Sequence, residues 1–149
     1  MRIEDAIKQR KFDNIWIKAL VNLHYTSNFY SDLLLAILKP YRINDQHYNV
    51  LRILKGQHPQ AVCPGYIKSV LLNKRGDLTR LVDKLCQKGY VARATNPTNR
   101  RMVDLNITEA GLQLLQNLHT KIDTFEQLKH KLTIEEASLL NELLDKLRE

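Results

Sequence analysis

The 149-residue sequence has no apolar run long enough to cross a membrane, and its N-terminus has no signal-peptide core. Glycine and proline are scarce, with five and four residues, which excludes a wholly disordered chain. The two cysteines are too few for a disulfide framework. We interpret Cys86 as a small buried residue, and Cys63 either as an inert thiol or as a redox sensor. These absences predict a cytoplasmic globular protein with no membrane partner.

The residue patterns that identify many enzymes are also missing. The five histidines show no metal-ligand spacing, and there is no glycine-rich phosphate loop or nucleophile elbow. We therefore predict no enzyme activity, no catalytic residue, no cofactor and no metal site.

The sequence does contain a strongly amphipathic stretch from Asn73 to Gln87. On a helical period its apolar side carries Leu78, Leu81, Val82 and Leu85. The opposite side carries Gly76, Thr79, Arg80, Asp83 and Gln87. Asn73 is a candidate N-cap, and Gly89 stands where a left-handed residue commonly ends a helix. The pattern predicts a helix with one core face and one polar reading face.

The excess positive charge of the chain lies in and around this helix. Between Lys68 and Arg101 there are nine basic and two acidic residues, a net charge of +7, whereas the rest of the chain has fourteen of each sign. Such a concentration is typical of a surface that binds nucleic acid. The alternative reading is a solvated face that happens to be basic.

Two shorter helices are predicted before this one. The first runs from Asp45 to Lys55, with Asn44 as a plausible N-cap and Gly56 just past its end. The second covers residues 65–71 and is joined to the amphipathic helix by four residues, 72–75. Two short helices with a tight connection, the second of them with a polar N-terminal half, indicate a helix-turn-helix.

A β-hairpin is predicted directly after Gly89. Residues 90–95 alternate in polarity, and residues 101–107 place Val103, Leu105 and Ile107 on one side. Residues 96–100 between them contain a proline suited to a turn. An additional short extended piece is predicted at residues 61–63. The hairpin has basic residues at its base and tip, which indicates the wing of a winged helix.

Long apolar helices are predicted on both sides of this unit. A helix from Asp13 to Pro40 has more apolar surface than one side of a small domain covers, which favours a partner subunit over a wide core face. Thr108 caps a helix that is predicted to reach about Lys131, with Phe125 and Leu128 on its apolar side. A capping box of Thr133 and Glu136 opens a leucine-rich last helix. Both C-terminal helices are expected to pack against the long N-terminal one.

The order of these elements and three segments resemble the MarR family of bacterial transcription regulators. The segments are KPYRINDQHYNVLRIL (39–54), DLTRLVDKLCQKGYVAR (77–93) and NPTNRRMVDLNITEAG (96–111). The resemblance covers about residues 13–147 and implies a homodimer with its interface on the first and last helices. It implies a recognition helix in the major groove and a wing in or along the minor groove. It also implies a cleft for small phenolic or other anionic ligands, although no residue identifies such a ligand.

The predicted fold is mainly α with a small β-hairpin wing. It is one domain over residues 1–149, with a winged helix-turn-helix at about 44–107 and dimerisation helices at 13–39 and 108–147. The dimer interface is predicted to include Ile15, Trp16, Leu20, Leu139, Leu143 and Leu147.

Each candidate DNA contact has an assigned role. Base edges in the major groove are assigned to Gly76, Asp77, Thr79 and Arg80, with Arg80 as the guanine contact. Phosphates are assigned to Lys68, Lys74, Arg75, Lys84, Arg100 and Arg101. Either wing arginine could instead enter a narrow minor groove. Arg93 either contacts DNA or pairs with Asp104 across the hairpin.

The wing departs from the family pattern at one place. Where the family usually has Asp-x-Arg, this chain has Asn99, Arg100 and Arg101. The change removes a carboxylate that could pair with arginine and leaves the wing more positive, and we include Asn99 in the DNA-binding site.

The predicted function is that of a sequence-specific double-stranded DNA-binding regulator. We expect a repressor that binds a pseudo-palindromic operator as a homodimer, with release by a small-molecule effector as a further expectation. The alternative is a winged-helix adaptor that contacts an acidic protein and does not bind DNA specifically.

Overall fold

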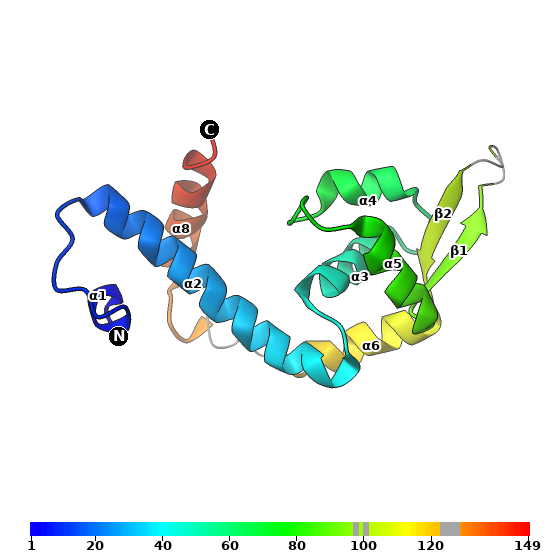
Figure 1. The fold of residues 1–149 in the computed structure, drawn as a ribbon, viewed down its shortest axis with the longest axis horizontal. Helices are drawn as coiled ribbons and strands as arrows, with labels where there is room; N and C mark the ends of the chain where they lie inside the picture. The colour runs from blue at the N-terminus through cyan, green and yellow to red at the C-terminus, as the bar shows by residue number, and fades with distance from the viewer. Residues whose placement is uncertain (97–98, 100–101, 123–128) are drawn as a thin grey trace.

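The computed structural model describes residues 1–96, 99, 102–122 and 129–149. Its longest helix, α2 (Ile15–Leu38), begins at Asn14, whose side-chain oxygen accepts hydrogen bonds from the amides of Trp16 and Ile17. A 3-10 turn, η1 (Lys39–Tyr41), contains Pro40 and ends α2 where the sequence predicted. Figure 1 shows a cluster of helices and the two strands at the C-terminal end of α2, whereas the first and last helices of the chain lie outside this cluster.

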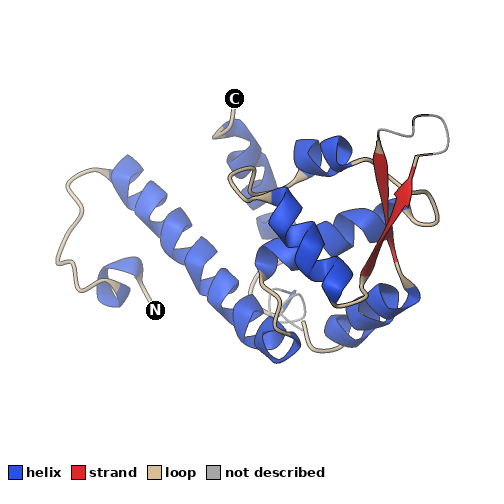
Figure 2. Ribbon diagram, turned by 45° about the vertical axis from the view of Figure 1, so that its right-hand side comes forward, coloured by secondary structure: helices blue, strands red, loops and turns tan. Residues whose placement is uncertain are grey.

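That cluster contains the predicted winged helix-turn-helix and one more helix. In chain order it consists of α3 (Asp45–Gln57), α4 (Pro64–Val70), α5 (Leu78–Gln87), β1 (Val91–Thr95), β2 (Val103–Ile107) and α6 (Glu109–His119), which the sequence predicted as part of the dimerisation helices. Figure 2 shows the two strands at the edge of the cluster farthest from α2. The largest fully buried side chains are Leu38, Val50, Leu51, Leu54, Ile67, Leu85, Leu105 and Leu118. All six elements and the end of α2 therefore share one core.

Helix α3 has the N-cap that the sequence predicted, Asn44, and a capping box that it did not predict. The Asn44 side chain accepts from the His47 amide at 3.1 Å, and the Asn44 amide donates to His47 Nδ1 at 3.2 Å. The predicted end at Lys55, with Gly56 just past it, was wrong. Gly56 lies within the last turn and the helix continues to Gln57, because the amide of His58 bonds back to the carbonyls of Leu54 and Lys55.

The hairpin has the two antiparallel strands that the sequence predicted. β1 and β2 are antiparallel, with Val91 opposite Ile107 and Thr95 opposite Val103. The predicted extended piece at residues 61–63 is also confirmed, since Val62 and Leu105 exchange two backbone hydrogen bonds of 3.0 and 2.8 Å. These bonds anchor the base of the wing to the chain segment before α4.

The turn from α5 into β1 depends on two glycines. Gly89 has φ +73°, the left-handed conformation predicted for it. Its carbonyl accepts from the Thr108 hydroxyl at 2.6 Å, and that hydroxyl also caps α6 by accepting from the Gly111 amide at 3.1 Å. A Cβ on Gly111 would lie 2.4 Å from the carbonyl oxygen of Tyr90. Only glycine permits α6 to pack this close to the turn.

The C-terminal helices differ from the prediction. α6 ends at His119 instead of continuing to Lys131, because the Thr120 hydroxyl bonds to the Asn117 carbonyl and the amide of Lys121 closes a three-residue turn onto Leu118. Phe125 and Leu128 lie outside the described residues. The last helix, α8 (Ile134–Lys146), opens with the predicted capping box of Thr133 and Glu136.

The two C-terminal helices pack differently. α6 contributes Leu114, Leu115 and Leu118 to a core that it shares with α3 and with the C-terminal end of α2. α8 has no buried residue, and its Leu139, Leu140 and Leu143 are exposed. The expected packing of α8 on α2 stays a prediction.

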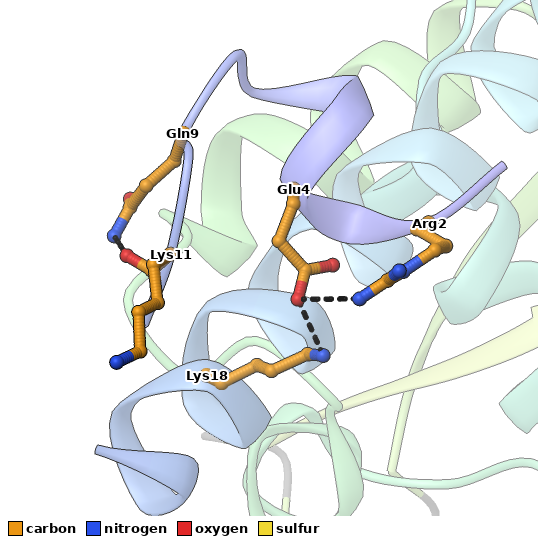
Figure 3. Close-up of polar contacts among 5 residues, drawn as sticks. All are labelled: Arg2, Glu4, Gln9, Lys11 and Lys18. Atoms are coloured by element: carbon orange, nitrogen blue, oxygen red, sulfur yellow. Dashed lines mark hydrogen bonds and ion pairs between the residues drawn. The ribbon is translucent and has the colours of Figure 1, made fainter. Parts of the chain in front are cut away.

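The N-terminal arm folds onto the start of α2. It contains a single short helix, α1 (Ile3–Ala6), and Ile3 is buried. Figure 3 shows Arg2 and Lys18 converging on Glu4, with Lys18 Nζ 2.6 Å from the carboxylate. The hydrogen bond from Lys18 lowers the pKa of the Glu4 carboxyl. In the same arm Gln9 donates to the backbone carbonyl of Lys11.

The buried capping box predicts a pH-dependent stability. His47 is 5% exposed, and its pKa is lowered by burial and by Lys84 and Lys88, with Asp45 acting in the opposite direction. Below about pH 6.5 the unfolded chain takes up a proton that the folded ring resists, so the free energy of unfolding falls. His47→Gln keeps a capping side chain that does not titrate. Urea unfolding at pH 7.5 and 5.5 should show a larger loss of stability for the parent than for His47→Gln, and equal losses would contradict this account.

Candidate nucleic-acid interface

Helix α5 has the two faces that the sequence predicted. Leu81, Val82 and Leu85 are buried, and they pack against α3 and the start of the hairpin. On the opposite side Thr79, Arg80 and Lys84 are exposed, and the Arg80 side chain is 88% exposed. The buried side therefore fixes the direction in which the polar side points.

The start of α5 differs from the prediction. The helix begins at Leu78, and its N-cap is Asp77, whose Oδ1 accepts from the Arg80 amide at 3.3 Å. Asn73, the predicted cap, instead accepts from the amide of Arg75 two residues later, which closes a turn. The connection between α4 and α5 is correspondingly longer than predicted and covers residues 71–77.

Two residues assigned to base edges also have neighbours within the chain. A Cβ on Gly76 would lie 2.7 Å from the side-chain oxygen of Gln46 on α3, the far end of a flexible side chain that can move away. Asp77 caps α5 and also lies 3.8 Å from Arg80 Nε. Their contact with bases stays a prediction, whereas Thr79 and Arg80 are the residues whose side chains face outward from the first turn.

The cations assigned to phosphates lie on adjacent elements. Lys68 is on α4, Lys74 and Arg75 are in the connection, and Lys84 is one turn after Arg80 on α5. All of these side chains are exposed. The helix-turn-helix therefore has an exposed cationic surface around the polar side of α5.

The chain leaves β1 toward the tip of the wing at Asn96. There the Asn96 side chain donates to Asp104 at 2.8 Å, and the amide of Asn99 donates to the Asn96 side chain at 2.9 Å. Arg100 and Arg101 lie outside the described residues, so their assignment stays a prediction.

The proposed pairing of Arg93 with Asp104 was wrong. Asp104 lies opposite Ala94 and accepts from Asn96, whereas Arg93 Nη2 donates to Asp83 on α5 at 2.5 Å. Sequence reasoning placed Asp83 on the reading face and missed this partner. The available signal was a pair of opposite charges on either side of the Gly89 turn.

Cys86 lies beside this pair. It is partly buried against the core, as predicted, and burial raises the pKa of its thiol. Cys63 is the N-cap residue of α4 and is also partly buried. A redox role for Cys63 stays an open prediction.

A second exposed surface is apolar. On α2, Ile15, Trp16 and Leu20 are 67%, 76% and 59% exposed, and only Leu38 of that helix is buried. On α8, Leu139, Leu143 and Leu147 are 55%, 51% and 64% exposed. The reading of α2 as a wide core face was therefore wrong for the single chain. Apolar side chains exposed in such number are typical of a surface that binds another molecule.

A pocket of about 510 Å³ lies between α2 and the helix-turn-helix. Tyr30 and Leu34 of α2 line one side, Tyr48 and Arg52 of α3 another, and Leu72 of the α4–α5 connection a third. Arg52 donates to the Tyr48 hydroxyl at 3.2 Å. The pocket is thus mainly apolar with a cation at its wall.

Within the ranges described, no group of histidine, cysteine and acidic side chains is placed to hold a metal ion. In the same ranges no helix has the length and hydropathy of a membrane span.

A helix-turn-helix followed by a basic hairpin, with exposed apolar helices on both sides, defines a winged-helix protein. The sequence profile of the MarR family matches residues 43–102. The chain is 30% identical over 126 residues to the multiple antibiotic resistance protein MarR of Escherichia coli K12, covering 83% of this chain and 86% of that protein. This chain belongs to the MarR family, and it is a transcriptional regulator, not an enzyme.

Solved structures agree with this assignment. A cysteine-to-serine mutant of E. coli MarR, complexed with operator DNA, has a TM-score of 0.78 at 29% identity, covering 92% of this chain and 98% of that one. The MarR transcription factor of Planctomyces limnophilus has a TM-score of 0.68 at 31% identity, covering 93% and 98%. The predicted family and fold are therefore confirmed.

Proposed function

We propose that this regulator is a homodimeric repressor that binds a pseudo-palindromic operator in double-stranded DNA. The observation that carries the proposal is the separation of its surfaces. Exposed cations lie around the polar side of α5, and exposed apolar side chains lie on α2 and α8. The E. coli relative in complex with operator DNA supports the same use of the fold.

Contacts with DNA divide by position on α5. Thr79 and Arg80 lie in the first helical turn, and in helix-turn-helix proteins the N-terminal residues of the second helix reach base edges. Lys84 lies one turn later, where a flexible ammonium suits a phosphate. Lys68, Lys74 and Arg75 extend the phosphate contacts, and Arg100 and Arg101 extend them along the wing.

A twofold dimer would present two such surfaces to one face of a duplex. Since the same patch must meet itself across the axis, the exposed leucines of α8 and the exposed residues of α2 are suited to form the interface. Half-sites would then be separated by about one helical turn of DNA.

The pocket between α2 and the helix-turn-helix is the proposed effector site. A ligand there would contact the dimer helix through Tyr30 and the reading helices through Tyr48 and Leu72. A small aromatic anion fits its apolar walls and the Arg52 cation. Binding of this ligand would favour one angle between the dimer helices and the helix-turn-helix. If only a different angle fits the operator, the ligand would release the DNA.

The DNA assignment predicts different losses for two cations of α5. After the operator is selected from random duplexes, Arg80→Gln should lower base discrimination at one position per half-site by about 1–3 kcal/mol. Lys84→Gln should weaken all sequences alike and reduce the slope of log affinity against log salt by about one per subunit. Binding titrations at several salt concentrations measure both effects. If both variants lose affinity equally for all sequences, the assignment of Arg80 to bases and Lys84 to phosphates is wrong. Weak, salt-insensitive DNA binding by the parent would favour the alternative function, a winged-helix adaptor for an acidic protein.

The dimer assignment predicts a strong effect of charge on α8. Leu143→Glu should weaken dimerisation at least about a hundredfold, because the twofold axis buries two unpaired carboxylates. Asn141→Glu, on the polar side of the same helix, is the matched control and should leave the dimer intact. Sedimentation velocity separates the two results. If the dimer tolerates both substitutions, its interface does not include Leu143 and lies elsewhere on the chain.

The effector assignment predicts that filling the pocket blocks release. Ser31 is exposed on α2 and lines the pocket, so Ser31→Trp should keep the fold and occupy the ligand volume. Compounds from a panel of small aromatic acids that release operator DNA from the parent should lose at least about tenfold in potency, equivalent to 1.4 kcal/mol. Asn28→Trp, one turn away on α2 and outside the pocket, serves as the control. Equal potency in all three chains would exclude this pocket.

A further inference from the structure

The turn between the recognition helix and the wing is fixed by backbone contacts close to the turn itself. The amide of Gly89 bonds to the carbonyl of Cys86 at 2.9 Å, and the amide of Tyr90 bonds to that of Leu85 at 2.9 Å. The hydroxyl of Thr108 adds its bond to Gly89. These bonds fix where the helix and the strand meet. Because they lie at the turn itself, they constrain the angle between the two elements only weakly.

One polar contact joins α5 and β1 at positions away from the turn. Asp83 is a full turn before the last residue of α5, and Arg93 is the third residue of β1. Arg93 Nη2 lies 2.5 Å from Asp83 Oδ1, and the two side chains are 42% and 45% exposed. This charge-assisted hydrogen bond, which we call the brace, links α5 to the β1–β2 ribbon at a distance from the turn.

Asp83 carries a negative charge in an otherwise basic part of the chain. It is one of two acidic residues among nine basic ones between Lys68 and Arg101. On a surface that attracts phosphates a carboxylate weakens long-range attraction. A pair this exposed contributes up to about a fivefold change in a folding equilibrium, so stability alone gives it little value.

We propose that Asp83 and Arg93 are positioning residues that hold the β1–β2 ribbon at one angle to α5. With that angle fixed, helix and ribbon present one rigid surface to a single duplex. The inference rests on the proposed DNA-binding function, because the brace acts on how the surface fits DNA and not on a contact of its own with bases.

The brace and simple electrostatics predict opposite effects of one substitution. Asp83→Asn removes a negative charge, so electrostatics alone tightens binding to every duplex. With the brace lost, affinity for the selected operator should instead fall about fivefold relative to a scrambled duplex of the same length. Asp45→Asn is the matched control, since it removes one exposed negative charge from α3, which packs on α5, and touches neither the brace nor a residue assigned to DNA. That variant should tighten binding to both duplexes.

Restoring the pair in reverse completes the binding test. The double variant Asp83→Arg, Arg93→Asp should regain discrimination between operator and scrambled duplex, whereas each single substitution should lower it. If Asp83→Asn tightens operator binding as Asp45→Asn does, the positioning role is overturned.

A measurement without DNA tests the brace independently of the proposed function. Spin labels at positions 79 and 94, in a chain carrying Cys63→Ser and Cys86→Ala, report the distance from α5 to β1. Pulsed EPR should give a narrow distance distribution for the parent and the reversed pair, and a broader one for Asp83→Asn. An unchanged width would overturn the brace even if DNA binding is established. A parent that shows the narrow distribution but binds no duplex would refute the proposed function and leave the brace standing.

Discussion

The structure depends on the burial of one side of α5. Leu81, Val82 and Leu85 are held between α3 and the start of the hairpin, and no rotation of the helix keeps them buried while turning Thr79 and Arg80 inward. The apolar contact thus determines the direction of the polar side. Burial of three such side chains is worth roughly 1.5–3 kcal/mol each, far more than any exposed ion pair on the opposite side.

The remaining elements place this helix relative to the rest of the molecule. Gly111 permits α6 to approach the turn at Tyr90, and Val62 ties β2 to the segment before α4. The reading cluster is therefore cross-linked by short-range contacts on several sides. α2 and α8, by contrast, expose apolar side chains that nothing in the single chain covers. A rigid reading part and helices with exposed apolar side chains are the two features that the proposed dimeric DNA-binding function requires.

Much of this arrangement could be predicted from the sequence because it depends on local residue patterns. Asn44, Thr108 and Thr133 were identified as caps, Gly89 as the left-handed residue, and both strands by alternation. Each of these signals operates within four or five residues, so no tertiary information was needed.

The errors arose where a tertiary or competing local contact decided the outcome. Asn73 and Asp77 are both good caps in one polar run, and the hydrogen bond from Arg75 to Asn73 left Asp77 as the cap. Arg93 could reach either of two carboxylates, and only the packing of β1 beside α5 selects Asp83. The packing of α6 on α3, in the core that both share with the end of α2, likewise depends on where that core lies and not on the pattern of leucines.

The central claim is that α5 and the hairpin of one subunit act together as a single DNA-facing surface. Amide hydrogen exchange of the full chain, with and without the selected duplex, tests it directly. The account predicts slower exchange in both α5 and the β1–β2 strands when DNA is bound, with α8 unchanged at saturating protein concentration. Slower exchange confined to α2 and α8, with α5 and the strands unaffected, would contradict it.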